Sequence, residues 1–410
     1  MSAHCQTAPV TKRYLTPGVA VLIGLALIAA GICLYRFVFG LAAVTNLSDR
    51  YPWGLWIAVD VATGVALAAG GFTSAALTHI FHRSQYEPVV RPALITAMLG
   101  YTFVGLGLMA DLGRYYNIWH PAWPTMWQGN SVLFEVGMCV MAYLTVLYIE
   151  FLPMVCEWSR AGGKLPKPLA FLNAPLAGFL RIAERALGKT MSLFIIAGVV
   201  LSCMHQSSLG ALMLITPYKM SPLWYTPILP LLFLLSAIAV GLPMVIFESI
   251  LASRSFGRKP EIEILAPLSR LALVFIGIYL GAKITDLMVR NMYLRVFNGS
   301  FESNMLLIEL GLGLAAPFAI LLSARRRSSA GWIFLASTLT VLGVALNRVN
   351  VYIVAYHPAY TTARYVPSVS EVLVTLGLAA TLVLVYRAIV SIFPVLPVDH
   401  GAEPSHRIAG

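Results

Sequence analysis

The chain has 410 residues, of which 59% are hydrophobic and 11% charged, and its mean hydropathy is +0.80. Soluble domains carry about 25% charged residues, so this composition excludes a water-soluble globule. A net charge of +11 could indicate a nucleic-acid partner, but the Lys and Arg residues lie in short loops between apolar runs, as topology signals do. We therefore expect contact with membrane lipid and none with nucleic acid.

Apolar runs of about 20 residues, the length that crosses a bilayer as a helix, recur along the whole chain. Strands of a membrane barrel are shorter and alternate in polarity, so continuous runs predict helices. The fold class is thus an all-α polytopic membrane bundle, with a tail at 1–16, a transmembrane domain at 17–393 and a tail at 394–410. The first apolar run has no small-residue cleavage site after it, which predicts a retained helix. The ten predicted spans lie near 17–40, 53–80, 91–113, 130–155, 191–210, 223–251, 266–290, 303–324, 331–355 and 369–393.

The loop charges predict the orientation. Placing the N-terminus in the cytoplasm puts most Lys and Arg residues inside, from Lys12 and Arg13 to Arg387 and Arg407. The basic residues left outside are Arg50, Arg114, Lys219, Arg290, Arg295 and Arg364. The positive-inside rule therefore favours a bacterial inner-membrane protein with both termini in the cytoplasm. The longest connection, 156–190, carries the amphipathic stretch APLAGFLRIAERALGK, which predicts an interfacial helix on the cytoplasmic face.

A weak internal repeat relates the second to fourth spans to the eighth to tenth. WGLWIAVD, ending at Asp60, is echoed by ESNMLLIE, ending at Glu309, and the HPA motif recurs. NSVLFE, ending at Glu135, likewise resembles PSVSE, ending at Glu371. Six helices separate the matching elements, so both copies would cross the membrane in the same direction. Chance similarity between apolar segments is the alternative.

Ionisable residues inside the spans are informative, because each costs at least about 2.5 to 3.5 kcal/mol at the bilayer centre unless it is paired or hydrated. The predicted topology gathers most of them near the outer helix ends and leaves His79, Glu150 and Glu248 on the inner side. The outer set is Asp60, Asp111, Arg114, Glu135, His205, Lys283, Asp286, Glu309, Arg348 and Glu371.

Structural pairing could explain much of this outer set. Lys283 and Asp286 lie three residues apart and would neutralise each other on one helix face. Arg348 would pair with Glu371 or Glu309, and Asp111 with Arg114 at a helix end. Glu150 and Glu248 could be solvated or paired with loop arginines. Glu135 and His205 have no opposite charge nearby in their own helices.

Aromatic residues crowd the same outer side, as an interfacial belt or the rim of a cleft would: Trp53, Trp56, Tyr101, Phe103, Tyr115, Tyr116, Trp119, Trp123 and Trp127. Quinone chemistry needs an apolar cleft, hydrogen-bond donors for the two carbonyls and a group that exchanges protons. A glutamate or a histidine in such a cleft can serve as that group. The outer cluster is compatible with a quinone site.

Seven runs carry a resemblance to a known family: YPWGLWIAVD, QYEPVVRPALI, DLGRYYN, NSVLFE, CMHQSSLG, YKMSPLW and MVIFES. Over nearly its whole length the chain resembles the integral membrane subunits of hydrogenase-2-type uptake hydrogenases, in the wider NrfD/polysulfide-reductase membrane-anchor family. The resemblance implies a haem-free, ten-helix subunit whose substrate is menaquinone or ubiquinone. It also implies a docked periplasmic ferredoxin-like iron-sulfur subunit, which would receive electrons from the catalytic subunits of a [NiFe] hydrogenase.

The resemblance also implies that Glu135 serves quinone-linked proton transfer. We expect His205 and Asp60 to share that site, with Arg114 and Trp56 contacting the quinone. A path from His79, Glu150 and Glu248 would bring protons from the cytoplasm to Glu135. Members of this family also serve formate, sulfur-compound and multihaem-cytochrome donors, so the donor is open at this point.

Two other classes of function compete with the redox subunit. The repeat and the buried charges would suit a secondary transporter, but the spans show no paired Gly/Pro-broken helices that would form a midplane site. A b-type cytochrome would need paired histidines from facing helices. Only His79 and His205 lie within spans, at opposite faces of the membrane. The five cysteines form no CxxC or CxxCH motif, so an iron-sulfur cluster or c-type haem would belong to a partner.

Overall fold

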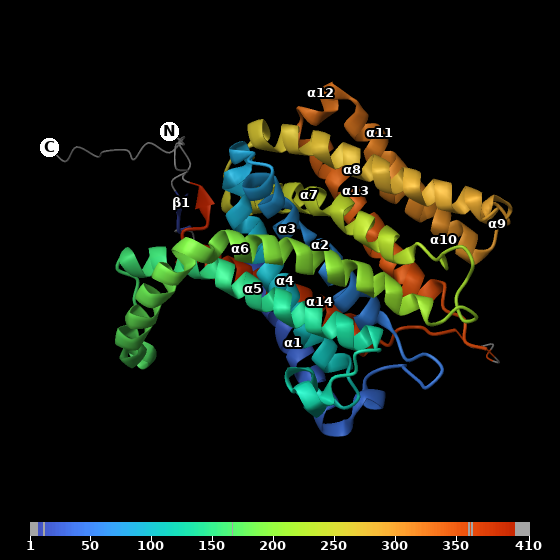
Figure 1. Cartoon of the computed structure of the whole chain (residues 1–410), viewed down its shortest axis with the longest axis horizontal. Coiled ribbons are helices and arrows are strands. Elements are labelled where there is room, and N and C mark those ends of the chain that lie inside the picture. The colour runs from blue at the N-terminus through green and yellow to red at the C-terminus, as the bar shows by residue number, and fades with distance from the viewer. Residues whose placement is uncertain (1–6, 11–12, 166, 360, 362–363, 398–410) are drawn as a thin grey trace.

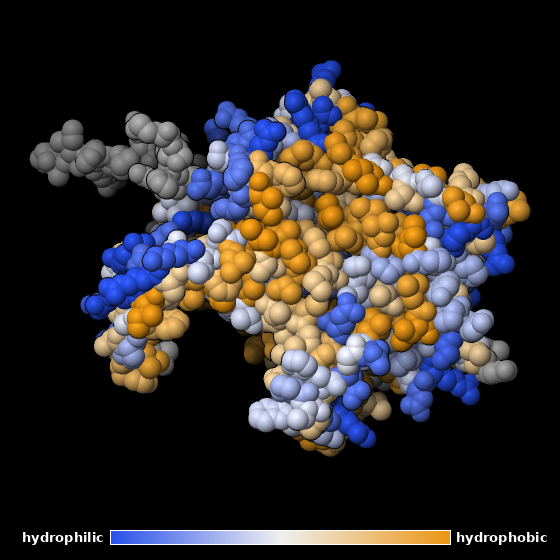
Figure 2. Space-filling view, viewed as in Figure 1, coloured by the Kyte–Doolittle hydropathy of each residue, from blue (hydrophilic) through white to orange (hydrophobic). Residues whose placement is uncertain are grey.

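The computed structural model describes residues 7–10, 13–165, 167–359, 361 and 364–397. In this part of the chain ten helical spans are long and apolar enough to cross a membrane, which confirms the all-α polytopic fold. The basic residues Lys12 and Arg407, used above for orientation, lie outside the described residues. Figure 2 shows hydrophobic residues around the middle of the bundle and hydrophilic residues gathered toward its two ends.

Helices account for almost all of the described chain. The α-helices are α1 (Pro17–Phe39), α2 (Gly64–Leu67), α3 (Ala69–Ala75), α4 (Glu87–Asp111), α5 (Val132–Arg160), α6 (Asn173–Leu214), α7 (Leu229–Phe256), α8 (Ile262–Val289), α9 (Tyr293–Val296), α10 (Phe301–Leu310), α11 (Ala316–Leu322), α12 (Ala324–Arg327), α13 (Ala330–Val349) and α14 (Val369–Ile392). The strands are β1 (Thr7–Ala8) and β2 (Leu396–Pro397).

Four stretches of the spans are π-helical, which hydropathy alone does not predict. Trp56–Thr63 and Ala76–Ile80 lie at the two ends of the second span, and Gly311–Ala315 joins α10 to α11. Asn350–Val354 extends α13. A π-helical turn adds a residue to the helical repeat and rotates the side chains that follow, and such turns are frequent at functional sites.

The two tails meet at one end of the bundle, where β1 and β2 pair antiparallel through Thr7 and Pro397 (Figure 1). Arg91 of α4 fixes this pair, because its Nη1 donates to Thr7 Oγ1 at 3.0 Å and to the Pro394 carbonyl at 3.0 Å. The same guanidinium makes a bidentate ion pair with Glu157 of α5, at 2.7 and 2.8 Å. We call this end of the bundle the terminus side and the opposite end the distal side.

The helices pack as two halves side by side. The second span, α4, α5 and α6 form one half, and α7, α8, α10, α11 and α13 form the other, with α7 packed against α3 and α6 across the boundary. Helices α1 and α14 pack against each other, and α14 also packs on α4. The polar residues considered below therefore fall into separate helix interfaces.

The predicted interfacial helix at 174–189 and the fifth span form one continuous helix, α6, of 42 residues. Its only proline, Pro175, stands in the first turn, where a missing N–H costs nothing, so no residue breaks the helix before Leu214. The segment that joins α5 to the membrane-spanning part of α6 projects from the bundle on the terminus side (Figure 1). One side of this projection is hydrophilic and the other hydrophobic (Figure 2).

Candidate functional site

Glu135 lies in the first turn of α5 on the distal side. The helix begins after Ser131, whose Oγ accepts from the Phe134 N–H at 3.3 Å, and the N-terminal partial positive charge favours a carboxylate at this position. Ser208 of α6 donates from Oγ to Glu135 Oε1 at 2.5 Å. The residue is exposed, so its carboxyl group is accessible at the α5–α6 interface.

His205 lies one turn of α6 further into the bundle and is fully buried. Its Nδ1 lies 2.7 Å from the Leu201 carbonyl, which can only accept, so Nδ1 carries the proton. In the neutral imidazole, the other ring nitrogen, Nε2, then accepts the hydrogen bond from the Tyr101 hydroxyl of α4. Both nitrogens of His205 are engaged in hydrogen bonds.

Tyr143 of α5 continues this cluster toward the terminus side. Its ring packs edge-on against Tyr101, with centroids 4.7 Å apart, and 5.5 Å from the His205 ring. The buried Ser202 Oγ and Gln206 Oε1 of α6 have no hydrogen-bond partner among the described residues. Buried polar atoms are usually satisfied by protein or water, so this interface can hold ordered water.

Glu150 lies at the terminus-side end of the same helix interface. Glu135, Tyr143 and Glu150 are eight and seven residues apart, which is close to two helical turns each, so they share one face of α5. Gly198 of α6 makes room for the acid, because a Cβ there would lie 3.0 Å from Glu150 Oε1. We name the series Glu135, Ser208, His205, Tyr101, Tyr143 and Glu150 the α5–α6 polar series.

Asp60 lies elsewhere, in the π-helical turn of the second span. Thr375 of α14 donates to Asp60 Oδ2 at 2.8 Å, and Gly107 of α4 packs so closely that a Cβ there would lie 3.0 Å from Asp60 Cβ. The acid lines a cavity of about 210 Å³ with mostly apolar walls, including Phe103 and Leu378. The structure thus brings Glu135 and His205 into one helix interface and places Asp60 against α14.

No hydrogen bond or ion pair among the described residues joins Trp56 or Arg114 to Glu135. The buried Trp56 indole donates from Nε1 to the Glu371 carbonyl at 3.1 Å and packs with Ala110 and Val374. Arg114 is exposed in the loop after α4.

The expected ion pair between Asp111 and Arg114 is wrong, because Asp111 Oδ1 has no hydrogen-bond partner among the described residues. Arg36 of α1 closes the end of α4 instead, donating to the Ala110 carbonyl at 2.7 Å and to that of Leu112.

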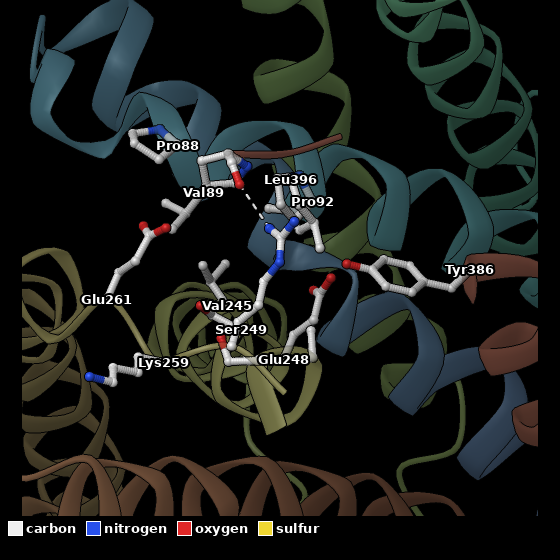
Figure 3. Close-up of a pocket in the computed structure, with 15 residues that line it drawn as sticks. Pro88, Val89, Pro92, Val245, Glu248, Ser249, Lys259, Glu261, Tyr386 and Leu396 are labelled. Carbon is white, nitrogen blue, oxygen red and sulfur yellow. Dashed lines mark hydrogen bonds between the residues drawn. The ribbon is translucent and has the colours of Figure 1, made fainter. Parts of the chain in front are cut away.

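Glu248 of α7 lies at the terminus side, in a second helix interface. It lines a cavity of about 50 Å³ between α4, α7 and the β2 strand, and Figure 3 shows the Tyr386 hydroxyl pointing toward its carboxyl group. Neither Glu248 Oε1 nor the Tyr386 hydroxyl has a hydrogen-bond partner among the described residues. Arg258 donates to the Pro397 carbonyl at 2.8 Å and holds β2 over this cavity. His79 is exposed at the end of the second span.

Two expected pairings in the second half of the chain are also wrong. Lys283 pairs with Glu309 of α10, whereas Asp286 pairs with Arg290 at 2.5 Å, so Lys283 and Asp286 do not neutralise each other. Arg348 pairs with neither Glu371 nor Glu309 directly; its Nη1 donates to Asn347 Oδ1 at 2.7 Å. Hydropathy and spacing show that these charges are in the membrane, but helix rotation decides which of them meet.

Four neutral residues contact the predicted acids and histidine: Ser208, Tyr101, Tyr143 and Thr375. The sequence pattern placed Tyr101 only in the aromatic set on the outer side and did not indicate the other three. Helical spacing could have found Ser208, which lies three residues after His205, and Tyr143, which lies eight after Glu135. Tyr101 and Thr375 come from other helices, and nothing in their local sequence connects them to the site.

Comparison with known proteins agrees with this architecture. The family model described as polysulphide reductase, NrfD, matches residues 43–358. The probable Ni/Fe-hydrogenase 2 b-type cytochrome subunit of Escherichia coli is 33% identical over 392 residues, which cover 95% of each chain. The menaquinone reductase integral membrane subunit of Nitratidesulfovibrio vulgaris is 27% identical and covers 88% of each chain. Because the family model spans most of the sequence and the hydrogenase subunit aligns nearly end to end, the chain belongs to the NrfD family of membrane subunits of redox complexes.

Proposed function

We propose that this chain is the quinone-reactive membrane subunit of a respiratory oxidoreductase complex, with its reaction site at Glu135 on the distal side. The observation that carries the proposal is the α5–α6 polar series, in which an accessible carboxyl group heads a line of buried hydroxyl and imidazole groups that ends at the half-buried Glu150. A quinone reduced by two electrons also takes up two protons, so a reducing site needs both an accessible acid and a way to resupply it.

The Glu135–Ser208 pair has the geometry for proton exchange. Ser208 Oγ lies 2.5 Å from Glu135 Oε1 and 3.0 Å from the Met204 carbonyl, and its single proton can point at only one of them. With Glu135 ionised, the hydroxyl donates to the carboxylate. When Glu135 is protonated and ready to donate to substrate, the hydroxyl can turn to Met204, so neither state leaves the serine proton unsatisfied.

Protons would reach Glu135 along the α5–α6 interface from Glu150 at the terminus side. Tyr143, Tyr101 and His205 occupy the interval, and Ser202 and Gln206 provide polar atoms that water can join. This route needs neither Glu248, which lines a different cavity, nor the exposed His79. Asp60 lies in a different interface, between the second span and α14, and lines an apolar cavity there. It would contact the quinone only from the α14 side.

Electrons would arrive at the distal side from a periplasmic ferredoxin-like iron-sulfur subunit, with the termini in the cytoplasm. The loop between α4 and α5, next to Glu135 in the chain, exposes Tyr116, Trp119, Trp123 and Trp127, which suits a protein interface. The 33% identical hydrogenase 2 subunit favours a [NiFe] hydrogenase as donor. Relatives named as selenate and dimethyl sulfoxide reductase subunits keep another donor as the alternative.

The proposal includes no haem in this chain. A b-type haem would need axial imidazole nitrogens, and His205 uses both of its nitrogens in hydrogen bonds to Leu201 and Tyr101. The name of the Escherichia coli relative contains the words b-type cytochrome, and spectroscopy distinguishes the two cases. An absorption spectrum of the purified subunit with a Soret band at one haem per chain would contradict this part of the proposal.

The test is Glu135→Gln in the intact complex. Glutamine keeps the size and can still accept from Ser208, but it cannot give or take a proton, so we expect quinone reduction to fall about 100-fold. Reduction of a soluble dye by the catalytic subunits should be unchanged. Glu263→Gln, at an exposed acid in the first turn of α8, is the matched control and should leave both activities intact. Unchanged quinone reduction in Glu135→Gln, with no quinone extracted from the purified complex, would refute the proposal.

A further inference from the structure

The second half of the chain contains a buried polar cluster that the Glu135 site does not use. Lys283 of α8 and Glu309 of α10 form an ion pair in which the side chains are 5% and 1% exposed. Asn347 and Asn350 donate to Glu309 at 2.8 and 2.7 Å, and the Trp224 indole donates at 3.1 Å. Four donors therefore converge on one carboxylate.

This cluster contains two cationic side chains, Lys283 and Arg348, and one carboxylate, Glu309. Arg348 is fully buried and donates to Asn347 Oδ1 at 2.7 Å and to Ser236 Oγ at 2.7 Å, but it forms no ion pair with a described carboxylate. Asp286 is already balanced by Arg290. Lys283 and Arg348 therefore share the single negative charge of Glu309, and the group carries a net charge of +1 inside the bundle when all three are ionised.

An uncompensated charge at this depth is costly, and the cluster can lose it by one route. A guanidinium keeps its proton in proteins, whereas a buried lysine ammonium can give its proton up. If Lys283 releases a proton, Glu309 remains balanced by Arg348 through Asn347, which bonds both of them. The cluster then has no net charge. The groups next to the lysine are neutral: Asn347, and Tyr279, whose ring centroid lies 5.9 Å from Lys283 Nζ.

A small cavity and a surface depression lie between Lys283 and the distal side of the bundle. A cavity of about 10 Å³, close to the size needed by a single water molecule, is lined by Lys283, Asp286, Thr226 and Asn347. Asp286 Oδ1 accepts from Thr226 at 2.6 Å, and its Oδ2 bonds Arg290, which reaches the Pro222 carbonyl at 2.6 Å. Pro222 lines an open depression of about 310 Å³ on the distal surface, together with Lys219, Arg295, Glu302 and His357.

We propose that Lys283, paired with Glu309 and crowded by Arg348, is a proton-exchange site that opens to the distal side through the Asp286 cavity. In the exchange, the Nζ–H bond of the ammonium breaks and the proton passes through cavity water to the distal surface, leaving a neutral amine. The reverse step restores the ion pair. The second half of the chain thus carries its own proton site, separate from the chemistry proposed at Glu135.

The test is Lys283→Arg, which keeps a positive charge against Glu309 but cannot release a proton. We expect infrared difference spectra of the purified full chain, recorded over a pH series, to show a carboxylate band that shifts as Lys283 loses its proton. The band should vanish in Glu309→Gln and stay at one position in Lys283→Arg. A purely structural ion pair would behave alike in the native chain and in Lys283→Arg, so a shift retained in Lys283→Arg, or absent from the native chain, overturns the proposal.

Two further variants keep the outcome interpretable. Lys283→Met removes the excess cation, so it should fold with a thermal midpoint close to that of the native chain, whereas Glu309→Gln leaves two buried cations and should be less stable. If Lys283→Met instead unfolds, the lysine is required in its charged form and the proposal fails. Glu135→Gln should keep the pH-dependent band unchanged, which separates this result from the fate of the quinone proposal.

Discussion

The carboxylate of Glu371, in the first turn of α14, accepts three hydrogen bonds. The N–H groups of Ser368 and Asn46 donate to it at 2.8 and 3.1 Å, and the Tyr365 hydroxyl donates to its other oxygen. Tyr365 also accepts from the Leu55 N–H at 3.0 Å, so one phenol connects the loop before the second span to α14. Burial, together with the hydrogen bond to Glu371, raises the pKa of the Tyr365 phenol, which therefore stays protonated and donates throughout the physiological pH range.

Replacing Tyr365 by Phe should remove this connection. The variant leaves a buried carboxylate one donor short, and a hydrogen bond to a charged group contributes about 1.5 to 3 kcal/mol, so we expect the free energy of unfolding to fall by about that amount. Thermal unfolding in detergent measures it. Tyr218→Phe, at a side chain that is 97% exposed on the same side of the bundle, should leave the midpoint unchanged. Equal midpoints for the two variants would contradict the role given to Tyr365.

The predicted repeat matches Glu371 with Glu135, and at the residue scale the two acids differ. Each stands in the first turn of a helix whose N-cap is a serine, Ser368 or Ser131. Glu371 folds back on its own cap as a capping box, whereas Glu135 accepts from Ser208 of the next helix. The sequence predicts both acids at helix starts on the same side. It cannot predict their partners, because these come from the packing of other segments.

At the scale of whole elements, the sequence predicts where helices cross the membrane better than how they are rotated. Apolar length identifies all ten spans, since it depends only on local composition. The π-helical turns at Trp56–Thr63 and Gly311–Ala315 do not follow from that composition. They alter the phase of each helix next to Asp60 and Glu309, which is one reason that pairing by sequence spacing fails for Lys283.

The π-helical turn Gly311–Ala315 and helix α13 approach so closely at two glycines that the crossing tolerates no side chain. A Cβ on Gly343 would lie 2.3 Å from Gly313 Cα, and a Cβ on Gly313 would lie 2.5 Å from Gly343 Cα. Gly313 follows Glu309 by four residues and Gly343 precedes Asn347 by four, about one turn in each case. The crossing therefore holds the Glu309 carboxylate against the Asn347 amide.

Gly343→Ala should force these helices apart. Overpacking of a tight interface costs about 1 to 3 kcal/mol, so we expect a lower thermal midpoint together with a weaker Glu309 band in the infrared spectrum. Gly331→Ala, in the first turn of α13, is the matched control, because a Cβ there meets only Ser329 Oγ, at 4.0 Å. It should be neutral or slightly stabilising, since alanine favours a helix more than glycine does. If both alanine variants behave alike, the close crossing does not limit stability.

At the scale of the whole molecule, the proposed chemistry depends on which side of the membrane each end of the bundle faces. The basic turn Ala324–Arg327 and the paired tails share the terminus side, while Glu135 and the exposed aromatic loop lie at the distal side. Lys and Arg in short loops resist translocation, so we expect the terminus side in the cytoplasm and quinone chemistry at the outer surface. Protons that reach Glu135 through Glu150 would then come from the cytoplasm, and Lys283 would exchange protons with the periplasm.

Cysteine labelling in cells tests this orientation. Tyr218→Cys, in the loop between α6 and α7, should react with a membrane-impermeant maleimide in right-side-out spheroplasts, whereas Ser329→Cys, after the basic turn, should react only in inverted vesicles. Cys5 is replaced by serine in both variants, and the four described cysteines, Cys33, Cys139, Cys156 and Cys203, are half-buried or buried and provide the unlabelled background. The opposite labelling pattern would place Glu135 in the cytoplasm, where a periplasmic electron donor could not reach it, and would reverse the direction of both proposed proton routes.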